Sequence, residues 1–246
     1  MLKSRLCIAF FAFAVGCAPA QKPLTDYVNP MLGTATLWDS VDLGFKPTKR
    51  TWGAEVFPGS SLPNAMVQVS PVTKFHSGAG YQYEDSVIYG FTHTNKGHWN
   101  LCHIPLLPVT GTPTPGDYCS PFSHERESAA PGYYQVFLDR YGVDAQLSST
   151  LRCAFHKYTY PAGAAASLLA DLQRSNEHVR AWDIRKEGDN VFAGWQQTGE
   201  KMYFYAVANR PVTGIEPVVE GDREVRIVRF GEGDGALELR IGFSFV

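Results

Sequence analysis

Hydrophobic and polar residues alternate along this chain in short runs, each bounded by turn-forming residues. In one run, Tyr203 and Tyr205 alternate with Phe204 and Ala206. A period of two residues is typical of strands in a sheet with one buried face. The runs predict the following strands: Met66–Val72, Val87–Thr94, Tyr133–Leu138, Ala145–Leu151, Ala154–Tyr160, Val179–Ile184, Val191–Gln196, Met202–Val207, Glu224–Phe230 and Leu237–Phe243.

This succession of strands, separated by Gly-Asp, Pro-Gly and Asn-Arg-Pro clusters, predicts an all-β protein folded as an antiparallel β-sandwich. The short stretch Ala164–Leu172 has helical composition, but it can also be a strand that begins at Ser167. Thr110–Pro121 is rich in Pro and Gly and predicts an ordered loop within the domain. The apolar, strand-like residues 241–246 lead us to expect that the sequence stops inside a longer protein.

The first twenty residues predict a secretory signal peptide, followed by a mature domain over residues 21–246. Lys3 and Arg5 precede the apolar run Leu6–Val15, which is shorter than the roughly 20 residues of a membrane span. Two processing routes remain open: cleavage after Ala20, or a lipobox with lipidation of Cys17. We expect an exported protein, either periplasmic, an outer-membrane lipoprotein or extracellular, that meets a membrane only through a lipid anchor at Cys17.

Composition narrows the function classes further. The 246 residues are 44% hydrophobic and carry a net charge of -2, which predicts a globular core and gives no basic surface for nucleic acid. Three cysteines remain after the signal, namely Cys102, Cys119 and Cys153. They permit one disulfide, although small buried thiols are the simpler interpretation, and no C-x-x-C pair indicates a metal site.

Polar chemistry is densest between Gly90 and His103, where three His, two Asn and one Trp follow a predicted strand. An indole beside amide and imidazole groups suits a sugar, which stacks its C–H face on a ring while its hydroxyls take hydrogen bonds. Structural hydrogen bonding within the loop is the alternative. Metal binding by His93, His98 and His103 is a weaker third, since their spacing matches no standard zinc pattern. The predicted substrate-binding residues are His93, Asn95, Gly97, His98 and Trp99.

Other polar groups give little reason to predict catalysis. We expect Trp52 in the core and Glu55 on loop amides, and the alternative is that both face a ligand. Glu84 and Asp85 would point to opposite faces of a strand, and Glu125 with Glu127 is only a weak acid/base pair. Sequence motifs of serine hydrolases, P-loop proteins, dinucleotide-binding folds and HExxH metalloproteases are absent from the sequence.

An ordered series of motifs resembles the opening of glycoside hydrolase family 92. The segments are 27–34 (YVNPMLGT), 57–63 (FPGSSLP), 66–71 (MVQVSP), 80–83 (GYQY), 90–94 (GFTHT), 122–125 (FSHE), 131–134 (PGYY) and 155–161 (FHKYTYP). The series covers the chain from Tyr27 to Pro161, and no single segment is diagnostic.

The resemblance implies the N-terminal domain of a calcium-dependent, inverting exo-α-mannosidase. It implies a supersandwich-like, galactose-mutarotase-like β-sandwich that packs on a C-terminal (α/α)6 catalytic domain missing from this sequence. The acid, the base and the calcium ligands belong to that barrel, so no residue here inherits a catalytic or metal-binding role. No cofactor is expected in this segment, and its expected partners are mannose-containing glycans and the missing domain.

Family members lend residues of this domain to the rim of the mannose pocket, which implies that role for the Asn95–Trp99 loop, with Trp99 as the stacking platform. The sequence departs from the common pattern at Ala54–Val56 and at Asn95–Trp99, which indicates altered linkage or aglycone preference. We expect this chain alone to be inactive. A stand-alone, secreted or lipid-anchored glycan-binding module is the alternative, and hydrolysis by Glu125 and Glu127 is a third hypothesis.

Overall fold

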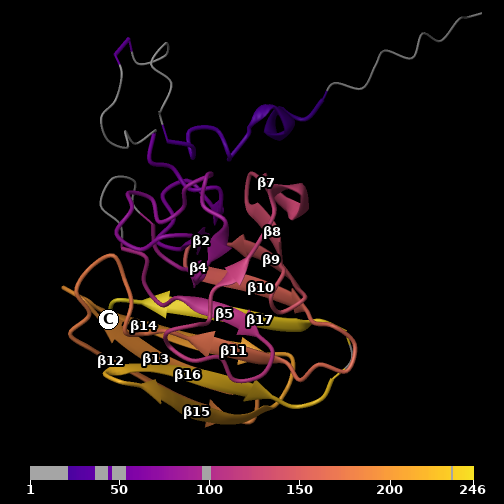
Figure 1. Ribbon diagram of the computed structural model, residues 1–246, viewed down its shortest axis with the longest axis vertical. Coiled ribbons are helices and arrows are strands. Elements are labelled where there is room, and N and C mark those ends of the chain that lie inside the picture. Colours follow the sequence, from indigo (N-terminus) through magenta and orange to yellow (C-terminus); the bar gives the residue numbers. More distant parts are fainter. Residues whose placement is uncertain (1–21, 37–43, 46–53, 96–100, 234) are drawn as a thin grey trace, which may run out of the picture.

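The computed structural model shows two antiparallel sheets packed face to face, the β-sandwich that the strand pattern predicts (Figure 1). It describes residues 22–36, 44–45, 54–95, 101–233 and 235–246. The expected signal peptide and Trp52 lie outside these ranges. No helix within them is long and apolar enough to cross a membrane.

The larger sheet has eight strands within the described residues, and each pairs with its neighbours in antiparallel register. Its inner positions are buried and its outer positions are partly exposed, most regularly in β8, β9, β14 and β17. In spatial order the strands are β12 (Ala181–Gly188), β13 (Val191–Gln197), β14 (Lys201–Ala208), β17 (Leu237–Ser244), β10 (Cys153–Thr159), β9 (Val143–Ser149), β8 (Tyr133–Leu138) and β7 (Glu127–Ala130).

The second sheet has seven strands in the same described ranges, and its central strands β5 and β11 are buried along their whole length. Tyr118, in the segment predicted as a loop, is buried, and its hydroxyl donates to Asp171 just after β11 at 2.6 Å. In order the strands are β1 (Ser60–Ser61), β2 (Gln68–Val72), β4 (Gly90–Thr92), β5 (Leu106–Val109), β11 (Ser167–Ala170), β16 (Arg223–Phe230) and β15 (Val212–Glu220).

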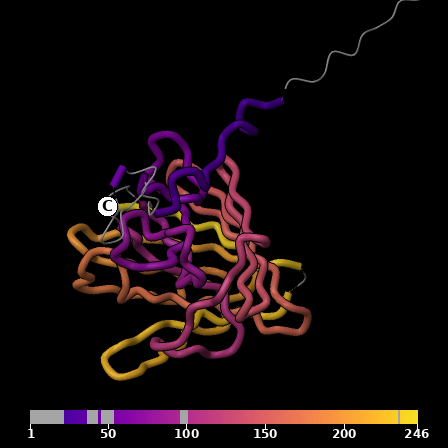
Figure 2. The backbone as a smooth tube through the Cα atoms, turned by 45° about the horizontal axis from the view of Figure 1, so that its top comes forward, coloured from indigo at the N-terminus to yellow at the C-terminus, as the bar shows by residue number. Residues whose placement is uncertain are grey.

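The remaining elements are small. Strands β3 (Val87–Ile88) and β6 (Ser120–Pro121) pair with each other, and two 3₁₀ turns, η1 (Leu24–Tyr27) and η2 (His124–Arg126), lie outside the sheets. The indigo and purple segments before β2 run over one end of the sandwich, beside β2 and β4 (Figures 1 and 2). Among the described residues, no helix or further sheet is assigned to the outer face of the eight-stranded sheet.

Sequence reasoning located most strands and misjudged a few boundaries. The single strand expected over residues 87–94 is divided into β3 and β4, since Gly90 has φ 156°. The ambiguous stretch after Ala164 contains β11, so the strand interpretation is confirmed. Strand β15 was not predicted, because its exposed edge position tolerates Pro217 and gives no regular burial pattern.

The three described cysteines are free thiols, so the single disulfide that the sequence permits does not form. Cys102 is buried, and desolvation raises the pKa of its thiol to about 12. This thiol therefore behaves as a small apolar side chain of the core, as the sequence indicates.

Leu147→Ala is expected to lower the free energy of unfolding by about 2–5 kcal/mol, because Leu147 is fully enclosed between the sheets and its removal leaves a cavity. Leu151→Ala is the matched control, since that side chain is 54% exposed and its loss should change stability by less than about 0.5 kcal/mol. Urea denaturation of both variants measures the difference. Equal losses would show that the core does not lie where the structure places it.

Candidate functional site

The polar segment between β4 and β5 leaves and re-enters the sandwich at one place. The backbone N–H of His93 donates to the carbonyl of His103 at 3.1 Å, and that of Cys102 donates to the carbonyl of Thr94 at 3.1 Å. These bonds form a short stem from residues 93–95 and 101–104. The tip of the loop, residues 96–100, lies outside the described residues, and with it the predicted site residues Gly97, His98 and Trp99.

A directed chain of hydrogen bonds holds the stem to the opposite sheet. His93 Nδ1 faces the carbonyl oxygen of Ile104 at 2.8 Å and must donate to it, so Nε2 of the neutral ring accepts. His156 Nε2, at 3.1 Å, donates to that nitrogen, and the Tyr158 hydroxyl donates to His156 Nδ1 at 2.5 Å. Every polar atom of both rings is therefore satisfied while the two histidines are neutral.

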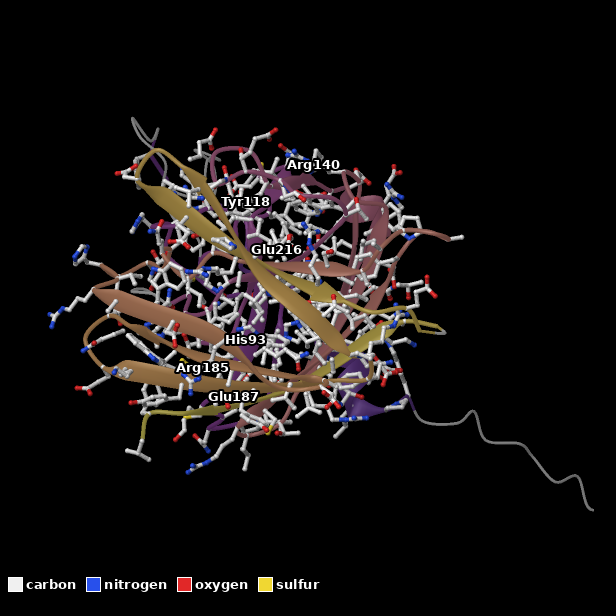
Figure 3. All side chains as sticks on the ribbon, turned by 90° about the horizontal axis from the view of Figure 1, so that it is seen from below. His93, Tyr118, Arg140, Arg185, Glu187 and Glu216 are labelled. Atoms are coloured by element: carbon white, nitrogen blue, oxygen red, sulfur yellow. The ribbon has the colours of Figure 1, made fainter. Side chains whose placement is uncertain are left out.

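Burial keeps these histidines uncharged. Both imidazoles are completely enclosed, and desolvation lowers the pKa of His93 to about 3. The pKa of His156 lies well below its ordinary value, first through desolvation and then through the neighbouring His93. His93 lies at the centre of the molecule in Figure 3. The structure therefore shows the predicted sugar ligand His93 as an interior residue that braces the loop.

His103 fixes the other side of the stem. Its Nδ1 lies 3.0 Å from the Thr94 hydroxyl and its Nε2 lies 3.0 Å from the Thr198 hydroxyl, at the turn between β13 and β14. Desolvation lowers the pKa of this ring, and Glu177 opposes that effect. Gln196 of β13 completes the attachment, accepting from Ile104 N–H at 2.8 Å. The ring nitrogens of His93 and His103 are thus engaged, so neither is available in this arrangement to the metal site weighed from the sequence.

The stem also has an unusual backbone conformation. Cys102 and Ile104 have φ values of 46° and 54°, in the left-handed region. A β-branched residue such as Ile104 rarely adopts this region, and such a conformation costs on the order of 1–3 kcal/mol. The surrounding hydrogen bonds stabilise it. Strained, over-determined positions of this kind cluster at functional sites.

A cleft of about 680 Å³ opens beside the stem. The loop after β11 forms one wall and contacts the stem directly, since the Ser175 hydroxyl and the Asn176 N–H both donate to the carbonyl of Leu101. The Gln196 side-chain amide also donates to the carbonyls of Leu172 and Arg174, at 2.9 and 2.8 Å. Among the residues that line the cleft are His76, Arg174, Glu177, His178, Arg180 and Trp182.

Asn95 is the one predicted ligand besides His93 within the described residues. It ends the stem and is almost fully buried, with its backbone N–H donating to Gln68 Oε1 at 2.9 Å. Neither Nδ2 nor Oδ1 of its side chain has a hydrogen-bond partner among the residues that the structure describes. Unpartnered buried amides are rare because they cost free energy. This amide can therefore donate to, and accept from, a group that enters beside it.

Sequence reasoning missed the contribution of the loop between β11 and β12. Arg174, Glu177 and Trp182 lie about 80 residues after the stem, and only the fold brings them beside it. The polar run 173–180 (QRSNEHVR) directly after a buried strand was the available signal. Loops that follow core strands are frequent positions for binding residues.

The weak carboxylate pair Glu125 and Glu127 does not form a catalytic arrangement. Glu127 is buried and accepts from the Tyr81 hydroxyl at 3.0 Å and the Tyr134 hydroxyl at 2.5 Å, while His124 Nδ1 lies 2.5 Å away. Glu127 therefore stabilises the junction of η2, β7 and β8. No group of three His, Cys, Asp or Glu residues in the described ranges is placed to hold a metal ion.

Comparison with known proteins identifies the family. The model of the glycosyl hydrolase family 92 N-terminal domain matches residues 27–244, so the chain belongs to this family. The resemblance noted in the sequence is thereby confirmed. No curated protein matches the chain.

Solved structures show the same fold. The family GH92 α-mannosidase BT3965 from Bacteroides thetaiotaomicron, solved with mannoimidazole, is 24% identical, with a TM-score of 0.78 over 92% of this chain and 33% of its own. The inverting mannosidase BT2199 from the same organism has 22% sequence identity and a TM-score of 0.73 over 92% of this chain and 32% of its own. The GH92 family glycosyl hydrolase ccman5 has 25% sequence identity and a TM-score of 0.65 over 76% of this chain and 30% of its own. This chain spans about one third of each structure.

Stability is expected to fall with acidification because His93 and His156 cannot take up protons while the protein is folded. Their folded pKa values lie below the unfolded value of 6.5. The contribution of these histidines to the free energy of unfolding is therefore fully present above about pH 6.5, and it is lost as the pH falls towards about pH 3. Each histidine contributes at most about 1.4 kcal/mol per pH unit. Urea denaturation between about pH 7 and pH 5 measures the slope.

His156→Gln is expected to reduce that slope by up to about 1.4 kcal/mol per pH unit, because one titrating group is lost while an amide can still donate and accept. His178→Gln, at an exposed cleft position, is the matched control and should retain the wild-type slope. An unchanged slope in His156→Gln would contradict the conclusion that His156 is neutral in the buried chain of hydrogen bonds.

Proposed function

We propose that this chain is the carbohydrate-binding N-terminal domain of an exo-acting α-mannosidase-like protein. Its loop at residues 95–99 forms the rim of a mannose pocket, and a separate C-terminal domain performs hydrolysis. The observation that carries the proposal is the cleft formed by the loop after β11, whose Ser175 hydroxyl donates to Leu101 at the base of the loop that is rich in Asn, His and Trp. Membership of family 92 supports it, since the similar structures are described as α-mannosidases.

The chemistry of the cleft suits a neutral sugar. Trp182 offers a partly exposed indole, and Arg174, Glu177 and Arg180 offer charged donors and acceptors around it. The unpartnered amide of Asn95 adds a donor and an acceptor at the end of the stem. Aromatic surface surrounded by bidentate hydrogen-bonding groups is what pyranose recognition requires.

Hydrolysis is assigned to the second domain because the described residues of this chain supply no acid/base pair. Glu127 is occupied by two tyrosines and a histidine, so it is not free to act as a pair with Glu125. The calcium that the family implies belongs to the same second domain, and the described residues here hold no cluster fit for it. This chain therefore binds and orients the sugar without breaking the glycosidic bond.

Export completes the proposal. The basic and apolar pattern of residues 1–20 supports delivery across a membrane, followed either by release after Ala20 or by lipid attachment at Cys17. Such a location gives the domain access to external mannose-containing glycans.

A stand-alone glycan-binding module is the second candidate function, favoured by the fact that this chain alone builds the cleft wall and the stem. The dye ANS separates the candidates. A half of a larger enzyme exposes the apolar surface that normally meets its barrel and should bind ANS, whereas a self-sufficient module should not.

Trp99→Ala is expected to weaken binding of methyl α-mannoside by about 2- to 10-fold, through loss of stacking on the indole. Trp182→Ala should have an effect of the same order, because its ring lines the cleft. NMR titration of the chain with the sugar measures both.

Tyr27→Ala is the control, since Tyr27 is 69% exposed and does not line the cleft. Binding that survives both Trp99→Ala and Trp182→Ala unchanged would refute the proposed position of the pocket. Mannoside turnover that is lost in Glu125→Gln would instead revive a catalytic role for this chain.

A further inference from the structure

The outer face of the eight-stranded sheet carries a second recess, formed by different residues from the cleft. It has a volume of about 760 Å³ and lies across β12, β13, β14 and β17. Arg185 and Glu187, which Figure 3 labels, line it from β12, the edge strand of this sheet. We refer to this recess as the outer groove.

Strand register creates the groove around Tyr205. This side chain is 53% exposed, and its direct neighbours across the sheet are Ala193 on β13 and Gly242 on β17. Neighbouring strands are only about 5 Å apart, so large side chains at these two positions would cover the phenol ring. Because both neighbours are small, both sides of the ring remain open.

An aromatic wall stands one row away. Trp195 on β13 is paired with Tyr203 on β14, and the Lys201 ammonium lies 4.1 Å from the centre of the indole and 5.8 Å from that of Tyr203. Lys201 therefore already covers the Trp195 ring through a cation–π contact. Tyr205 is left as the accessible stacking surface, with the wall at one side of it.

The charges at the groove balance one another. Arg185 donates to Asp183 at 3.2 Å and to Glu187 at 2.6 Å, and Lys201 supplies the second positive charge. Two cations and two anions leave no net field to attract an ionic ligand. The same side chains still offer donors and acceptors at the edge of an aromatic surface, which complements an uncharged, hydroxyl-rich ligand.

We propose that the outer groove is a second carbohydrate site, in which a neutral pyranose of an oligosaccharide stacks on Tyr205 and its hydroxyls bond Arg185 and Glu187. The site shares the ligand class of the proposed function but uses none of the residues of the cleft. Its volume is within the range of about 300–1,000 Å³ that small-ligand sites occupy.

Two opposite substitutions test the site in gels containing soluble α-mannan, where binding slows migration of the chain. Tyr205→Ala removes the stacking ring and is expected to weaken binding by about 2- to 10-fold. Gly242→Val fills the groove instead: its Cβ would meet only Cys153 Sγ, at 4.0 Å, so the fold should be retained while the sugar is blocked. Raised salt should leave binding unchanged, since the ligand is neutral.

The controls are matched in chemistry. Tyr27→Ala removes an exposed tyrosine elsewhere, and Gly214→Val adds the same methyl groups on β15, where a Cβ would meet nothing within 4 Å. Both should migrate like the unmodified chain. Circular dichroism of the four variants confirms that each one is folded.

The outcomes separate this site from the proposed pocket. Reduced retardation in Tyr205→Ala and Gly242→Val, together with retardation that persists in Trp99→Ala, supports a second site even if the pocket at Trp99 fails its own test. Retardation unchanged in both groove variants overturns the outer groove and leaves the pocket untouched. Dimers in analytical ultracentrifugation that Tyr205→Ala dissociates would also overturn it, because the face would then bind a second copy of the chain.

Discussion

A buried chain of hydrogen bonds from Tyr158 through His156 and His93 to the carbonyl of Ile104 ties the two sheets together. Tyr158 and His156 belong to β10 of the larger sheet, whereas His93 and Ile104 flank the loop between β4 and β5 of the smaller one. Apolar packing is not directional, so on its own it only weakly resists sliding of one sheet over the other. A hydrogen-bonded chain with a single permitted order of donors and acceptors fixes the relative position, because displacement would leave buried polar atoms unpaired.

The loop stem depends on this constraint. His93 and Ile104 are the two ends of the stem, so the chain that joins the sheets also holds the loop ends together. Gln196 extends the attachment to the loop after β11, which walls the cleft. A ligand that bound at the tip of such a loop would require little ordering of the base, and pre-organisation of that kind favours affinity. The described part of the polar motif is therefore a buried brace, and we propose recognition only for the residues beyond it.

Period-two patterning was sufficient to predict the sandwich, because each sheet buries one face along most of its strands. It gave no prediction for β15, an exposed edge containing Pro217, and it left β11, which is buried on both faces, open between helix and strand. The sequence shows the polar motif around His93. The interior position of His93 could not be predicted, since it depends on His156, 63 residues away and in the other sheet.

The outer groove likewise could be predicted only in part from the sequence. The alternation of Tyr203 and Tyr205 with buried residues is visible in the sequence, and it predicts that both rings lie on the face away from the core. Trp195 lies on the same face. A solvent-facing sheet surface has no packing reason to carry these three large aromatic residues, so their presence indicates a ligand or a partner. What decides between a covered and an open ring is the register, which sets Gly242 beside Tyr205. Glycine in a strand interior weakens the sheet and often marks a close approach by another molecule, and here it leaves open the one ring that Lys201 does not cover.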